Sequence, residues 1–73
     1  MRSYRAYQDG LGYRECQARD VPDAMGRLRA AGMRIGMPNL QVRMGQDRWE
    51  FAEVLPLHLG GYDRGRLTGE PLR

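Results

Sequence analysis

The side chains best suited to catalysis are scarce in this chain. His58 is its only histidine and Cys16 its only cysteine. A thiol and an imidazole can act together as nucleophile and base, but we expect Cys16 on the buried face of a strand, where cysteine behaves as a small apolar residue. His58 lies between two leucines just after Pro56, and we expect a structural role for it. Because one cysteine and one histidine also make a poor zinc site, we expect a non-enzymatic protein without a metal or cofactor.

Arginine supplies all of the basic side chains, 12 against 9 acidic ones, which gives a net charge of +3. A GC-rich genome would account for this bias through its codons. The functional interpretation is that guanidinium groups form bidentate contacts with carboxylates and phosphates and stack on aromatic rings. Charges of both signs are mostly interleaved along the chain, which is typical of a solvated surface. A duplex-DNA binder usually carries a stronger basic stripe.

The length of 73 residues allows one small domain. Such a chain buries only about 60–65% of its unfolded surface, so its stability is marginal and a partner or a second copy would add to it. The single cysteine excludes an intrachain disulfide, and no apolar run is long enough to span a bilayer. We therefore expect a soluble, cytoplasmic protein without a membrane partner.

Two strand–turn–strand patterns position the remaining polar and aromatic side chains, and the first spans residues 2–18. A loop of odd length centred on Gly10 sets Arg5 opposite Glu15, whereas a two-residue turn sets Arg5 opposite Arg14. Like charges in direct opposition are unfavourable, and a one-residue slip moves side chains to the other face. We therefore predict the odd-length loop, whose other pairs are Tyr4 with Cys16, Ala6 with Arg14, and Tyr7 with Tyr13.

The second pattern spans residues 40–55, with its turn at residues 45–47. An even-length loop at Gln46 and Asp47 places apolar side chains opposite one another on one face. On the other face it places a basic side chain opposite an acidic one. Because the two criteria agree, we predict this register. Its pairs are Met44 with Trp49, Val42 with Phe51, and Arg43 with Glu50.

Residues 20–32 have the features of a helix from cap to cap. Asp20 is placed to cap the first turn, and Pro22 is tolerated there because its missing donor would be unpaired anyway. Gly32 can adopt the left-handed conformation that ends a helix. Apolar residues at helical spacing form one stripe. Gly26 interrupts the interior at a cost of about 1 kcal/mol relative to alanine.

These elements predict an α+β fold. We expect a single domain over residues 1–59 with the order ββαββ, in which one antiparallel sheet carries one helix on one face. A further strand is considered at 33–37 or at 55–59, where Pro56 would confine it to an edge. Residues 60–73 are expected to form a tail that contains glycine and arginine. The predicted core is Tyr4, Ala6, Cys16, Ala18, Val21, Met25, Leu28, Ile35, Leu40, Val42, Met44, Trp49 and Phe51.

The sheet face without the helix is the predicted binding surface, because tyrosine and arginine are enriched at interface hot spots. We expect a non-catalytic protein, a small inhibitor or adaptor that docks on a protein or nucleoprotein through this face or through the edge after Pro56. The small size is typical of phage- or mobile-element-encoded blockers of host machinery. A homodimer is an alternative. The predicted partner-binding residues are Arg5, Tyr7, Tyr13, Glu15, Arg43 and Glu50.

A second interpretation is binding of single-stranded nucleic acid. Aromatic and arginine side chains on an open sheet can stack on unpaired bases. The predicted tail adds Tyr62, Arg64 and Arg66, spaced by glycine. Steep salt dependence would distinguish this function from protein binding.

Overall fold

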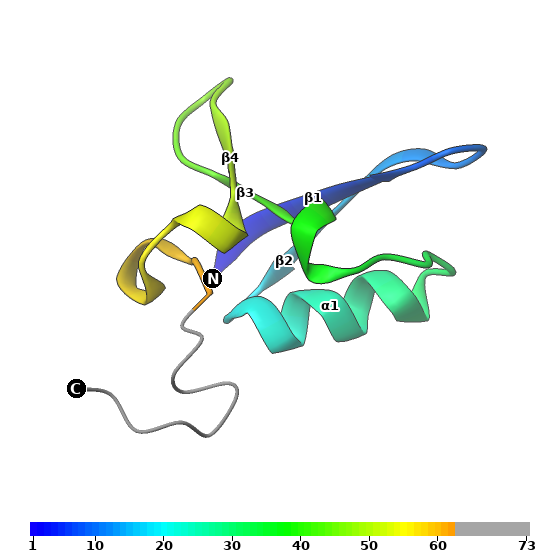
Figure 1. The fold of residues 1–73 in the computed structure, drawn as a ribbon, viewed down its shortest axis with the longest axis horizontal. Helices are drawn as coiled ribbons and strands as arrows, with labels where there is room; N and C mark the ends of the chain where they lie inside the picture. Colours follow the sequence, from blue (N-terminus) through cyan, green and yellow to red (C-terminus); the bar gives the residue numbers. More distant parts are fainter. Residues whose placement is uncertain (63–73) are drawn as a thin grey trace.

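The computed structural model describes residues 1–62 and confirms the predicted α+β fold (Figure 1). The four strands form one antiparallel sheet in the order β2-β1-β3-β4. Three short 3₁₀ turns, η1, η2 and η3, complete the described elements. Their bounds are β1 Arg2–Gln8, β2 Gly12–Ala18, α1 Val21–Ala30, η1 Met37–Asn39, β3 Gln41–Arg43, β4 Trp49–Phe51, η2 Ala52–Val54 and η3 Leu57–Leu59.

The first hairpin has the predicted register. Arg5 lies opposite Glu15, and the three residues between Gln8 and Gly12 form the loop. The N–H of Leu11 donates to the carbonyl of Gln8 over 3.0 Å. Gly10 and Gly12 take φ values of 89° and 76°, which only glycine adopts without strain. The glycines therefore permit the odd-length loop that the opposed charges favour.

The second hairpin is shifted by one residue from the predicted register, so that prediction is wrong. The pairs are Gln41 with Phe51, Val42 with Glu50, and Arg43 with Trp49. The N–H groups of Met44 and Gly45 both donate to the carbonyl of Arg48, over 2.8 and 3.3 Å. This shared acceptor places an extra residue in the loop, as in a β-bulge. Since directly opposed residues share a face, Glu50 moves to the side of Val42, while Trp49 and Phe51 move to the opposite side.

The helix begins and ends where the sequence predicts. The Asp20 carboxylate accepts a hydrogen bond from the Asp23 N–H over 2.9 Å, and Asp23 in turn accepts from the Arg19 N–H over 3.0 Å. Asp23 also pairs with Arg27 at 3.2 Å, one turn along. Gly32, at φ 96°, follows the last turn. The Asp20 side chain thus satisfies one of the free donors in the first turn of α1.

The core lies between α1 and the sheet face that carries Tyr4. Helix α1 packs mainly on β2. Predicted core residues that are buried are Tyr4, Ala6, Ala18, Val21, Leu28, Ile35, Leu40 and Val42, and they are joined by Ala24, Met33 and Ala52. Cys16, Met25 and Met44 are partly buried against this cluster. Trp49 and Phe51 were predicted wrongly, because the register of β4 turns them away from the helix.

The segment after β4 wraps around the start of β1 rather than forming another strand. The Arg2 guanidinium donates to the carbonyl of His58 over 2.6 Å, and the Tyr4 hydroxyl donates to the carbonyl of Gly60 over 3.1 Å. Gly60 and Gly61 are buried and Tyr62 is partly buried, so they belong to the packed part of the molecule. Residues 33–36 form no strand either. Arg64 and Arg66 lie outside the described residues.

A candidate docking surface on the open sheet face

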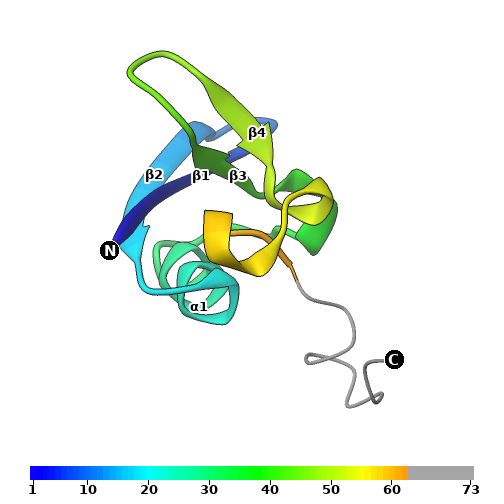
Figure 2. The same cartoon turned by 90° about the vertical axis from the view of Figure 1, so that its left-hand side faces the viewer.

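One face of the sheet is covered and the other is not. Helix α1 and turn η3 lie on the same side of the sheet (Figure 2). Side chains at alternate strand positions point to the opposite side, where no helix within residues 1–62 covers them. We call this side the open face. Its residues include Arg5, Tyr7, Tyr13, Glu15, Gln41, Arg43, Trp49 and Phe51.

A stacked guanidinium occupies the centre of the open face. The Cζ atom of Arg5 lies 4.3 Å from the ring centroid of Tyr13 and 4.4 Å from that of Trp49. Its Nε donates to the side-chain oxygen of Gln41 over 2.6 Å. Arginine suits this position because its planar, weakly hydrated cation can stack on rings and still donate hydrogen bonds. The stack joins β2, β1 and β4 and holds both rings in place.

The aromatic surface extends beyond this stack. Tyr7 meets Tyr13 edge to face, with centroids 5.2 Å apart and planes inclined by 62°. About half of the surface of these aromatic residues remains accessible, 50% for Tyr7, 53% for Tyr13 and 48% for Phe51. Aromatic side chains that are held in place but still exposed lose little conformational entropy when a partner covers them. The open face is thus a preformed aromatic platform.

The structure brings five of the six predicted partner-binding residues together. Arg5, Tyr7, Tyr13, Glu15 and Arg43 lie on the open face. Glu50 does not, because it lies opposite Val42 on the other side of the sheet. Sequence reasoning missed Gln41, Trp49 and Phe51. The signal in the sequence is Gly45, because a glycine inside a strand pattern often marks a bulge.

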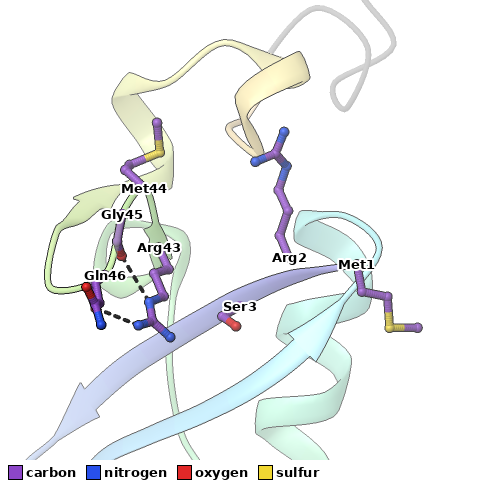
Figure 3. Close-up of a pocket in the computed structure, with 7 residues that line it drawn as sticks. All are labelled: Met1, Arg2, Ser3, Arg43, Met44, Gly45 and Gln46. Carbon is purple, nitrogen blue, oxygen red and sulfur yellow. Dashed lines mark hydrogen bonds between the residues drawn. The ribbon is translucent and has the colours of Figure 1, made fainter.

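A shallow hollow of about 380 Å³ lies between the start of β1 and the β3–β4 loop, and side chains from both sides of the sheet line it (Figure 3). Arg43 is the lining arginine on the open face. Its Nε donates to the carbonyl of Gly45 over 3.0 Å, and its Nη2 donates to that of Gln46 over 2.6 Å. The lining residues are Met1, Arg2, Ser3, Arg43, Met44, Gly45 and Gln46.

The reactive side chains identified in the sequence lie apart from this surface. Cys16 is on the helix side of β2, with its sulfur 4.0 Å from the carbonyl oxygen of Ala24. Burial raises the pKa of its thiol, which disfavours the nucleophilic thiolate. His58 is in η3, which lies on the same side as α1. Within residues 1–62, no three His, Cys, Asp or Glu side chains are grouped so that they could hold a metal ion.

Comparison with known proteins gives no relative: no protein-family model, curated protein or solved structure matches the chain. In the described part of the chain, none of the helices combines the length and the apolar character needed to traverse a bilayer.

Proposed function

We propose that this protein is a non-catalytic binding protein that docks on a protein partner through the open face, and so acts as a small inhibitor or adaptor. The observation that carries the proposal is the Tyr13–Arg5–Trp49 stack, flanked by the half-exposed rings of Tyr7 and Phe51. Interface hot spots are enriched in these residue types and sit within a rim of polar groups. Here Glu15 and Arg43 provide polar groups around the rings.

The charge arrangement favours a protein over single-stranded nucleic acid. The Arg5 cation already stacks on two rings and bonds to Gln41, so it is poorly placed to track phosphates. Glu15 lies opposite Arg5 and would repel a phosphate backbone. Base stacking on Tyr7 or Phe51 is the feature that nucleic-acid binding would use. The same double substitution, Tyr7→Ala/Tyr13→Ala, can therefore be used to test both ligands.

The test is selection of random displayed peptides on the immobilised full chain. We expect peptides that bind the wild type and fail to bind Tyr7→Ala/Tyr13→Ala. The matched control is Val54→Ala, because Val54 is a 72% exposed apolar residue in η2, outside the sheet. Peptide binding that survives the double substitution, or is lost equally in the control, would contradict the proposal.

The nucleic-acid alternative is tested by fluorescence anisotropy with random single-stranded DNA at two salt concentrations. For a protein-docking face we expect weak binding that is insensitive to Tyr7→Ala/Tyr13→Ala. Tight binding that depends on the two tyrosines and weakens steeply with salt would replace protein docking with nucleic-acid docking.

A further inference from the structure

The hollow beside the open face lies where the sheet forks. Strands β1 and β3 pair at Tyr4 with Val42 and at Arg5 with Gln41. Beyond Val42 the β3–β4 loop diverges from the start of β1, and the hollow occupies the space between them (Figure 3). Ser3 and Arg43 point to one side of β1 there, whereas Arg2 points to the other. Ser3 and Arg43 are thus the lining side chains that the hollow shares with the open face, next to the aromatic platform.

The Arg43 guanidinium is held in place by its own hairpin. Two of its nitrogens donate to the carbonyls of Gly45 and Gln46. A guanidinium carries five N–H donors, so these two contacts fix its plane while other donors remain for a ligand. Since the side chain is already ordered, little rotamer entropy is lost when an anion binds. Arg43 is thus a preorganised cation at the margin of the open face.

The charges around the hollow favour a negatively charged ligand. None of the seven lining residues is acidic, and two are arginines. Arg2 directs its guanidinium to the carbonyl of His58, on the other side of β1 from Ser3. Arg43 is therefore the lining arginine that a ligand on the open face meets. Glu15, the acidic residue of the open face, is on β2, two strands from β3. A carboxylate matches the guanidinium in shape and charge.

We infer that the partner surface is an acidic peptide segment, whose carboxylate enters the fork against Arg43 and Ser3. This inference rests on the proposed protein-docking function and names the chemistry of the partner. Trp49 lies directly opposite Arg43, and opposed side chains have Cβ atoms about 4.5–5.5 Å apart. The partner therefore presents an Asp or Glu close to an apolar side chain, which lies on the rings of the Tyr13–Arg5–Trp49 stack.

The composition of peptides selected from a random displayed library tests this inference. We expect peptides selected on the full-length wild type to be enriched in Asp or Glu beside an apolar residue. On Arg43→Gln the acidic enrichment is lost while the apolar enrichment stays. Arg48→Gln is the matched control, because Arg48 is an exposed arginine of the same loop that does not line the hollow. It should select the same peptides as the wild type.

A double-mutant cycle then measures the contact. For one selected acidic peptide, replacing Glu by Gln should weaken binding to the wild type by about threefold to fivefold, as for a partly exposed ion pair. The same change should have no effect on Arg43→Gln. If Arg43→Gln fails to fold, the peptide substitution on the wild type and on Arg48→Gln still measures the need for a carboxylate.

The outcomes separate the inference from the proposed function. Peptides that need Tyr7 and Tyr13 but show no acidic preference, or keep that preference on Arg43→Gln, overturn the acidic-segment inference alone. If no selected peptide depends on the two tyrosines, the proposed docking function itself fails.

Discussion

Arg5 shows that a correctly predicted strand pairing does not tell which residues a side chain will contact. The sequence predicts that it lies opposite Glu15, and it does. Its guanidinium nevertheless stacks between Tyr13 and Trp49 and bonds to Gln41. Alternation along a strand predicts which residues share a face. Whether the Trp49 ring reaches Arg5 across β3 depends on the register of the second hairpin. The central contact of the candidate surface therefore does not follow from side-chain alternation alone.

The thiol of Cys16 gives a prediction at the scale of a single group. Burial raises its pKa, so the folded state favours the neutral thiol. We expect a thiol reagent to label Cys16 more slowly in the native protein than in the urea-unfolded chain at the same pH. Above the ordinary thiol pKa of about 8.5 the unfolded chain ionises first. Stability should therefore fall as pH rises from that value toward the raised pKa, and Cys16→Ala should remove the part of this fall below pH about 10, where tyrosines begin to ionise. Above that pH the buried Tyr4 hydroxyl, whose pKa is also raised by burial, adds a slope of its own. Rapid native labelling would contradict the buried position.

Helix α1 offers a pair of substitutions with opposite signs. Asp20→Ala removes the acceptor for the Asp23 N–H and should lower the free energy of unfolding by about 1 kcal/mol. Gly26→Ala should raise it by about 0.5–1 kcal/mol, because a Cβ at Gly26 meets nothing within 4 Å.

Urea denaturation monitored by circular dichroism measures both changes. A destabilising Gly26→Ala would show that this exposed side of α1 is in contact with something else, such as a second copy of the chain. An Asp20→Ala variant as stable as the wild type would remove the role assigned to the cap.

The two hairpins show what a sequence can predict about strand pairing. In the first, a charge pair and two glycines with positive φ both point to one register, and the register is correct. In the second, the pattern of apolar and charged side chains points to a register that the structure lacks. The bulge at Met44 and Gly45 is made by main-chain groups alone, so side-chain alternation gives no sign of it. A single extra residue then exchanges the faces of Trp49 and Glu50.

The segment that follows β4 packs against the start of β1, and this packing requires glycine at position 61. The Gly61 N–H donates to the carbonyl of Pro56 over 3.0 Å. A Cβ at Gly61 would collide with the main chain of Leu55, which cannot move as a side-chain tip can. The sequence predicts a tail from residue 60, because glycine-rich composition is typical of loops and gives no indication of buried main-chain contacts.

Gly61→Ala should therefore destabilise the protein by about 1–3 kcal/mol, the usual cost of overpacking. Gly36→Ala is the matched control, because its nearest neighbour would be the Pro38 ring at an ordinary 3.6 Å. We expect that variant to stay within about 0.5 kcal/mol of the wild type. Equal stability of the two variants in thermal denaturation would show that residues 60–62 do not pack as described.

The central claim is that the tyrosines of the open face are available to a partner and contribute little to the core. Urea denaturation of Tyr7→Ala/Tyr13→Ala beside Leu28→Ala tests it most directly. Leu28 is 1% exposed under the sheet, and its truncation should cost about 2–5 kcal/mol. The double variant should lose only about 1–2 kcal/mol, from the ring pair and the Arg5 stack. A loss as large as that of Leu28→Ala would place the tyrosines in the core and contradict an open docking face.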